Sequence, residues 1–374
     1  MTPMHRADNR TWLQKYWPNL AWLTAAALFL LYALATRDAR AQVTAPPNPA
    51  LQWPTARALA RYDLPLGAVN VDAVRAALTA DPGTNTPNKP EDDTPDDPTD
   101  DFILGGVINV PAQVGTSCVI SGKKLDLSGG MTCVVQGTGD ASIIYLTNGA
   151  WIDCSGSSVD FRHLRIMQDN SKAAIVYCRG KNKDGTPRTA SINRCSLTDV
   201  RIDAAEGNGS QVGSLVSYGM EHFTARECHI ENKKPGGHTI ILDSAYLPQF
   251  GYSADVVSYT NSGLRFEDCI IGVRGGSGAE SAFVIGDMTT ELVFDGWICT
   301  SGMIDSLLKI RGDTVAFNRS RRPQNLVFDI APECSPVPPV MVRFLGTSKF
   351  SDLELRGYWK NKVLDGFEYG YPRR

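Results

Sequence analysis

The segment Leu197-Thr198-Asp199-Val200-Arg201-Ile202 decides the fold of this chain, because its alternation of apolar and polar residues recurs along the C-terminal part. A period of two is typical of a strand with one buried face. The pattern returns in residues 161–166, 225–230, 266–271, 294–298, 326–328 and 353–355. A strand that repeats in this way predicts a sheet assembled from equivalent segments.

A second kind of segment lies between these strands. It is an apolar strand that often ends in glycine, and it recurs in residues 142–149, 174–180, 214–219, 282–286, 307–312 and 340–346. The two kinds alternate about seven times, at spacings from the mid-twenties to about forty residues. Constant strands with variable spacing are typical of a solenoid whose loops differ in length. The sequence therefore predicts an all-β solenoid.

The period of two also predicts which side chains point inward. One inward stack is expected to hold Leu164, Val200, Cys228, Cys269 and Trp297, and the next to hold Ile166, Ile202, Ile230 and Ile271. Cysteines at such positions pack as small apolar side chains. Two of them, Cys228 and Cys269, are expected to face each other across one strand spacing of ~4.8 Å, where a disulfide would have to meet narrow geometric limits.

The residues between the inward ones form three outward columns. The first is expected to hold His163, Asp199, Glu227 and Asp268, the second Arg165, Arg201, His229 and Ile270, and the third Met167, Asp203, Glu231 and Gly272. Stacked carboxylates can raise one another's pKa and so provide a general acid beside a base.

This outward face supplies the candidate site residues. The catalytic candidates are the carboxylates Asp199, Asp203, Glu227 and Glu231. Glycoside hydrolysis needs two carboxylates, about 5–5.5 Å apart for retention and about 6.5–9.5 Å for inversion. A lyase would instead use an arginine as the base. The substrate-binding candidates are Arg165, Arg201, His163 and His229, with Tyr246 and Tyr252 on the insertion of residues 244–262. The alternatives are a solvated face with mixed charges and a packed loop.

The first strands add a resemblance to a known family. Residues 107–111 read V-I-N-V-P, residues 119–127 read V-I-S-G-K-K-L-D-L, and residues 131–140 read M-T-C-V-V-Q-G-T-G-D. This order resembles the opening coils of the pectate-lyase superfamily, which includes polygalacturonase-like enzymes and phage tailspikes. The resemblance implies a right-handed parallel β-helix that acts on or binds polysaccharides. Gly-His-Gly, Asn-Thr-Asp and Arg-x-Pro-x-x-Arg, which carry catalysis in that family, are absent, so no catalytic residue transfers.

The N-terminal segments predict export. Residues 1–41 contain the basic residues Arg6, Arg10 and Lys15, then an apolar run over residues 20–35 and an Ala-x-Ala cleavage pattern at residues 39–41. This segment is a cleaved signal peptide or an uncleaved membrane anchor with an N-terminal hydrophobic helix. Either way the rest of the chain is secreted, periplasmic or held outside the cytoplasm on a membrane.

A Pro-rich, acidic linker is expected over residues 42–101, because this composition cannot bury enough apolar surface to order itself. Within it, a short helix is expected near residues 71–79, capped by Asn70 or Asp72. The β-helix domain is expected over residues 102–374.

Composition excludes several function classes. The net charge is −3 and no basic stripe is present, which disfavours nucleic acid as a partner. Nine cysteines occur without a C-x-x-C pair, which disfavours a zinc site and a thioredoxin-type site. No metal or cofactor is expected. Trimers occur among viral β-helices, so a homotrimer stays open, although no heptad repeat supports one.

Two functions remain open. The first is an extracytoplasmic protein that interacts with an extended polysaccharide, either as a glycan-binding module or as a divergent hydrolase or lyase. The second is a non-enzymatic structural surface protein, such as an adhesin or a membrane-anchored viral spike. An uncleaved segment at residues 20–35 would favour the second function.

Overall fold

The computed structural model describes residues 60–80, 105–179, 194–205, 207–252, 261–286, 289–311, 324–330, 340–345 and 353–357 of the 374-residue chain. All of them belong to one compact unit that runs from Leu59 to Arg374. The apolar segment of residues 20–35, with its predicted helix and cleavage site, lies outside the described residues. Among the helices that are described, none has the length and apolar character needed to cross a membrane.

Two parallel β-sheets make up this unit, one of 14 strands and one of 8. The larger sheet holds β1 (Ala60–Asp63), β2 (Gly67–Ala68), β3 (Gly105–Asn109), β4 (Cys118–Ser121), β6 (Thr132–Gln136), β7 (Ile143–Thr147), β9 (Ser158–Asp169), β11 (Cys195–Ala204), β13 (Thr224–Arg226), β14 (His229–Asn232), β16 (Leu264–Arg274), β18 (Thr290–Ser301), β20 (Gln324–Ile330) and β22 (Leu353–Gly357). The smaller sheet holds β5 (Lys124–Asp126), β8 (Trp151–Asp153), β10 (Ile175–Cys178), β12 (Leu215–Tyr218), β15 (Ile240–Leu242), β17 (Ser281–Ile285), β19 (Ser306–Arg311) and β21 (Val340–Leu345).

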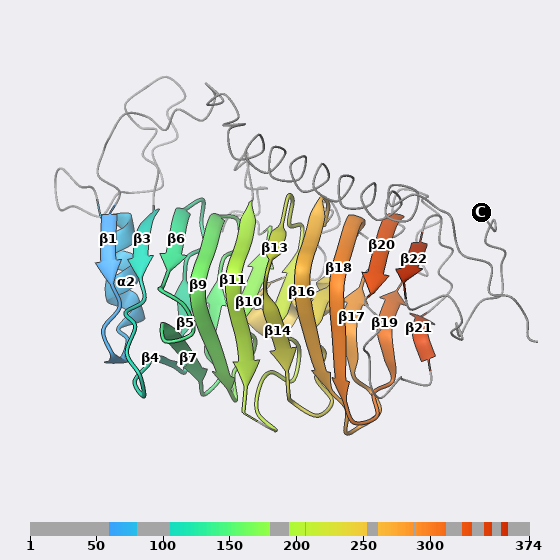
Figure 1. Ribbon diagram of the computed structural model, residues 1–374. Helices are drawn as coiled ribbons and strands as arrows, with labels where there is room; N and C mark the ends of the chain where they lie inside the picture. Colours follow the sequence, from blue (N-terminus) through green and yellow to red (C-terminus); the bar gives the residue numbers. More distant parts are fainter. Residues whose placement is uncertain are drawn as a thin grey trace, which may run out of the picture. The chain divides into compact units, whose positions relative to one another are not determined.

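The chain visits the two sheets in turn. From β8 onward, strands of the smaller sheet alternate along the chain with strands of the larger sheet, and each strand pairs in parallel with its equivalent one pass earlier (Figure 1). One pass through both sheets is termed a coil below. This arrangement confirms the predicted all-β class with parallel sheets, and the two kinds of repeating segment correspond to the two sheets.

The inward stacks agree with the sequence pattern except at one position. Leu164, Val200, Cys228 and Cys269 are buried, as is the second stack of isoleucines. The prediction for Trp297 was wrong, since this side chain is 39% exposed. Opposite Asp268 the register shifts, so that Gly296 pairs with Cys269 and Trp297 pairs with Ile270. β18 has no counterpart of Asp268, so Trp297 takes the outward position beside Ile270, while Ile298 stays buried beside Ile271.

A bend interrupts the long strands of the larger sheet. His163, Asp199, Glu227 and Asp268 all have positive φ, between 50° and 55°. They occupy equivalent register positions, since Thr198 pairs with Arg162 and Val200 with Leu164 on either side of the Asp199–His163 position. A left-handed residue turns the strand without ending its pairing. The first predicted column is therefore the row of residues at this bend.

The interior between the sheets is packed with aromatic rings towards the C-terminal coils. Phe283 of the smaller sheet lies 5.7 Å from Phe266, 5.4 Å from Phe294 and 5.3 Å from Phe328, measured between ring centroids. The rings meet largely edge to face, the geometry that aromatic pairs prefer. This ladder joins the two sheets across consecutive coils.

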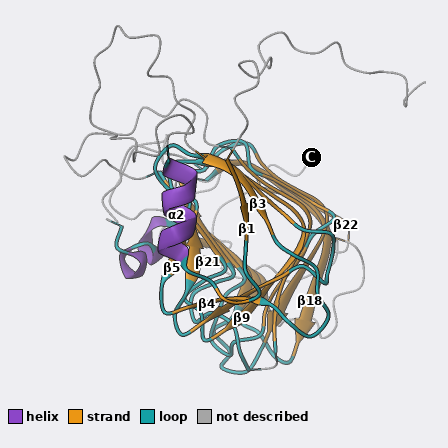
Figure 2. Ribbon diagram, turned by 90° about the vertical axis from the view of Figure 1, so that its left-hand side faces the viewer, coloured by secondary structure: helices purple, strands orange, loops and turns teal. Residues whose placement is uncertain are grey.

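Helix α2 (Val71–Thr79) covers the N-terminal end of the core, as Figure 2 shows. The Asn70 side chain caps it by accepting a hydrogen bond from Ala73 N at 3.1 Å, and its buried face of Val71, Val74 and Leu78 joins the main core. The predicted helix and its cap are confirmed. A linker was expected on both sides of this helix. Instead, β1 pairs with β3 and β2 pairs with β4, so residues 60–80 are part of the β-sheet unit.

Candidate functional site

The outward face of the larger sheet carries a row of polar and aromatic side chains across adjacent strands. Arg165 of β9 pairs with Arg201 of β11, which pairs with His229 of β14. The row continues through Ile270 of β16 to Trp297 of β18. These five positions are called the outward row below. The structure thus brings together three of the predicted substrate-binding residues and adds Trp297.

Beneath the outward row, Asp203 is held by two guanidinium groups. Arg165 Nε and Nη2 donate to its carboxylate oxygens at 3.0 and 2.8 Å, and Arg201 Nε donates at 2.8 Å. The Asp203 side chain is 3% exposed, while those of Arg165 and Arg201 are 27% and 38% exposed. Asp203 therefore orients both guanidinium groups, and Arg201 Nη1 also lies 3.9 Å from Asp140 Oδ2.

The neighbouring carboxylate, Glu231 of β14, lies near a lysine and a histidine. Lys233 Nζ lies 3.3 Å and His229 Nε2 lies 3.7 Å from Glu231 Oε2. Burial lowers the pKa of His229, with Glu231 opposing this shift and Arg201 adding to it. His229 is therefore a neutral hydrogen-bonding group at neutral pH.

The other two catalytic candidates lie at the bend, on the exposed surface. His163 Nδ1 and Asp199 Oδ2 are 3.0 Å apart, and their side chains are 53% and 59% exposed. Glu227 is exposed one strand further along, followed by Asp268. The four predicted carboxylates thus divide into Asp203 and Glu231, which are bound by cations, and Asp199 and Glu227, which face solvent.

A further stack of carboxylates was not predicted from the sequence. Glu267 pairs in register with Asp295, which pairs with Asp329 on the next strand. Partial desolvation, and then the charges of Asp329, Asp268 and Glu267, raise the pKa of Asp295. One glycine in the sequence indicates where this stack lies. Gly296, whose Cβ would lie 2.1 Å from Cys269 O, marks the place where the register changes and where Asp295 and Trp297 both turn outward.

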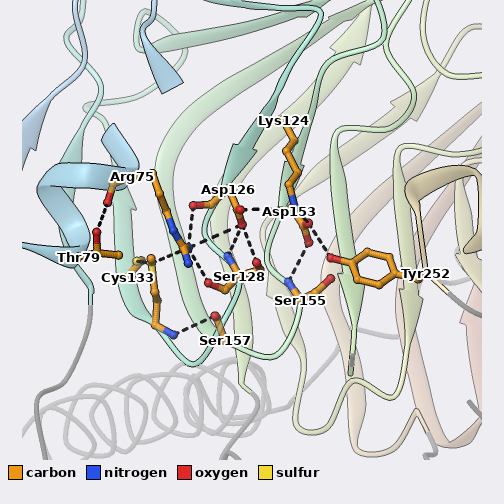
Figure 3. Close-up of polar contacts among 11 residues, drawn as sticks. Arg75, Thr79, Lys124, Asp126, Ser128, Cys133, Asp153, Ser155, Ser157 and Tyr252 are labelled. Carbon is orange, nitrogen blue, oxygen red and sulfur yellow. Dashed lines mark hydrogen bonds and ion pairs between the residues drawn. The ribbon is translucent and has the colours of Figure 1, made fainter. Parts of the chain in front are cut away.

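The predicted sugar-stacking tyrosines lie elsewhere, over the smaller sheet. Tyr252 points towards the buried carboxylate of Asp153, and its hydroxyl donates to Oδ2 at 2.6 Å (Figure 3). Lys124 Nζ binds the same oxygen at 2.7 Å. Burial, and then the charge of Asp153, raise the pKa of Tyr252. Tyr246 is partly buried, with its ring centroid 6.0 Å from that of His238.

These tyrosines belong to a segment that folds back over the outer face of the smaller sheet. The segment contains the 3-10 helices η2 (Ser244–Tyr246) and η3 (Pro248–Phe250). It packs on an apolar cluster that includes Val176, Val216 and Ile241 of successive strands. Tyr246 and Tyr252 therefore contact the body of the protein and do not share a face with the outward row.

The polar contacts of Asp153 continue towards helix α2. Lys124 also lies 3.5 Å from Asp126, and Arg75 of the helix donates to the carbonyl oxygens of Asp126 and Ser128 at 3.1 and 2.6 Å (Figure 3). This network joins the helix, the first strands of the smaller sheet and the folded-back segment. Its groups satisfy one another, which is typical of a structural network.

Within the described ranges, no group of three or more His, Cys, Asp or Glu side chains is arranged to hold a metal ion. Comparisons with protein-family models, with curated proteins and with solved structures find no match to the chain. The functional argument therefore depends on the outward row and the carboxylates beside it.

Proposed function

We propose that this protein binds an extended polysaccharide along the outward face of its larger sheet, outside the cytoplasm. The single observation that carries this proposal is the exposed indole of Trp297, 39% accessible, in register with a row of polar side chains. Exposed aromatic faces bind the apolar faces of sugar rings, while guanidinium and imidazole groups bind hydroxyl and carboxylate groups.

The proposed fold is a right-handed parallel β-helix of the pectate-lyase type. It is supported by the parallel pairing of each strand with its equivalent in the previous coil, and by the strong preference of parallel strand connections for the right hand. The proposed export rests on the apolar segment of residues 20–35 and the basic residues before it.

The dimensions of the outward row suit a polymer. From β9 to β18 it crosses four strand spacings of ~4.8 Å, or about 19 Å. Because each coil adds an equivalent position, a chain of repeating sugars can meet repeated contacts. Arg165 and Arg201 are pre-oriented by Asp203, so little side-chain entropy is lost when they bind a ligand.

Replacement of Trp297 by Ala tests the proposal. Binding of the full chain to immobilised neutral and anionic polysaccharides is measured by affinity electrophoresis, and a ligand that binds the wild type is carried forward. We expect Trp297→Ala to weaken binding by about tenfold or more. Met303→Ala is the matched control, because Met303 is an apolar side chain, 73% exposed and outside the row. Equal binding by wild type and Trp297→Ala would refute the proposal, and no binding to any polysaccharide would favour the structural surface protein.

Hydrolysis of the bound chain is a second candidate, favoured by the raised pKa of Asp295. Its register partner Asp329 lies one strand spacing away, which is near the about 5–5.5 Å separation of carboxyl groups in retaining glycosidases. A protonated Asp295 would serve as the acid and Asp329 as the nucleophile. New reducing ends released from a bound polysaccharide would support hydrolysis. Asp295→Asn and Asp329→Asn should each abolish that release, whereas the exposed Asp199→Asn should not.

A further inference from the structure

Two buried cysteines face each other on adjacent coils. Cys228 lies between β13 and β14, is 1% exposed, and belongs to the inward stack. Cys269 of β16 is 0% exposed and belongs to the same stack. The paired positions on either side, Arg226 with Glu267 and His229 with Ile270, place the two cysteines at equivalent positions of neighbouring strands.

Backbone hydrogen bonds hold this position from both sides. Glu227 N donates to Glu267 O at 3.0 Å, and Ile270 N donates to Cys228 O at 2.8 Å. Both cysteines directly follow a left-handed residue, Glu227 in one coil and Asp268 in the other. Adjacent in-register strands are ~4.8 Å apart, which lies within the about 4.4–6.8 Å between Cα atoms that a disulfide spans.

One of the two sulfur atoms is directed towards the neighbouring coil. Cys269 Sγ donates to Ala225 O of the neighbouring strand at 3.4 Å, and Cys228 Sγ donates to Arg226 O of its own coil at 3.2 Å. The two thiols also hydrogen-bond to one another, which raises the pKa of Cys228 and lowers that of Cys269. A thiol that receives such a bond is the better nucleophile of a pair.

We propose that Cys228 and Cys269 form a disulfide that joins two consecutive coils when the protein meets a disulfide oxidant. The thiolate of Cys269 attacks the oxidant RSSR and releases RS⁻, which forms a mixed disulfide. Cys228 then attacks the Cys269 sulfur and releases the second RS⁻, and the two leaving groups take up the protons of the two cysteines. One RSSR is reduced to two RSH, and the two thiols are oxidised to one disulfide.

The crosslink would enclose a complete coil. The chain between Cys228 and Cys269 includes β14, β15 and the folded-back segment with η2 and η3. Crosslinking such a length of chain restricts the unfolded state. The oxidised protein is therefore expected to unfold at a temperature about 5 °C above that of the reduced protein.

Peptide mapping of the full chain tests the proposal. The folded protein is incubated with oxidised glutathione, free thiols are alkylated, and the unreduced protein is digested with trypsin. Cleavage gives residues 227–233 and 266–274, each with a single cysteine. We expect one species with the summed mass of both peptides less two hydrogens, which disappears after reduction.

Matched variants make the result specific. Cys133→Ala removes another inward, buried thiol and should keep both the linked species and the increase in melting temperature. Cys228→Ala and Cys269→Ala should lose both. Recovery of residues 227–233 and 266–274 from the oxidised wild type as separately alkylated peptides would overturn the proposal, as would linkage of either peptide to a different cysteine. None of these measurements depends on a polysaccharide.

Discussion

Replacement of Asp203 by Asn removes the most deeply buried charge of the outward face while keeping the size of the side chain. The wild-type carboxylate accepts three hydrogen bonds from two arginines, at 2.8 to 3.0 Å. An Asn side chain offers one acceptor oxygen and an amide group that repels the guanidinium donors. Arg165 and Arg201 would then lie side by side without a counter-charge beneath them.

The expected loss of stability follows from these contacts. A hydrogen bond to a charged group contributes about 1.5–3 kcal/mol net, and two of the three bonds are lost. The arginines are 27% and 38% exposed, so water solvates part of each charge after the substitution. We therefore expect the lower end of the summed range, a decrease in the free energy of unfolding of about 3 kcal/mol.

Urea unfolding followed by tryptophan fluorescence measures this loss, with Asp199→Asn as the matched control. Asp199 lies on the same strand, but its partner His163 and its own side chain are more than half exposed. An exposed pair contributes little, so the control should change the free energy of unfolding by less than about 0.5 kcal/mol. A loss for Asp203→Asn as small as that of the control would refute the argument that buried Asp203 is stabilised by both arginines.

Three further outcomes are expected. Burial lowers the pKa of His238 to about 4. Since the unfolded pKa is ~6.5, the unfolded state takes up a proton first as the pH falls. The free energy of unfolding should drop by up to about 3 kcal/mol from pH 6.5 to 4, and His238→Asn should flatten this slope in urea titrations. Tyr252→Phe removes a donor to buried Asp153 and should cost about 1–2 kcal/mol, with faster limited proteolysis near residue 252. Phe283→Ala opens a cavity between the sheets and should cost about 3–5 kcal/mol by urea unfolding, whereas the exposed Val114→Ala should not.

Much of the larger sheet could be predicted from the sequence, because period-two alternation depends on local residue choice alone. It identified the isoleucine stack from Ile166 to Ile271 and the outward positions of Arg165, Arg201 and His229. It failed at Trp297, where β18 lacks a counterpart of Asp268. A register change of one residue leaves the alternation intact on both sides, so only the pairing partner reveals it.

The candidate site was less predictable than the fold. The predicted outward columns included Asp203 and Glu231. They did not predict that arginine and lysine side chains would bind the carboxylates of these two residues. The contacts of Arg201 with Asp203 and of Lys233 with Glu231 depend on side-chain rotamers, which alternation does not encode. Arg165 reaches Asp203 from the neighbouring strand of the previous coil. Similarly, Tyr252 lies on an insertion whose composition does not show that it folds back onto the apolar outer face of the smaller sheet.

Helix α2 covers the N-terminal end of the core and therefore also affects how readily the first coils open. In a structure where each coil contacts only its neighbours, the terminal coils have one partner instead of two and open first. Val71, Val74 and Leu78 supply the missing partner at the N-terminal end. Amide hydrogen exchange should therefore be slow in β3 and β6.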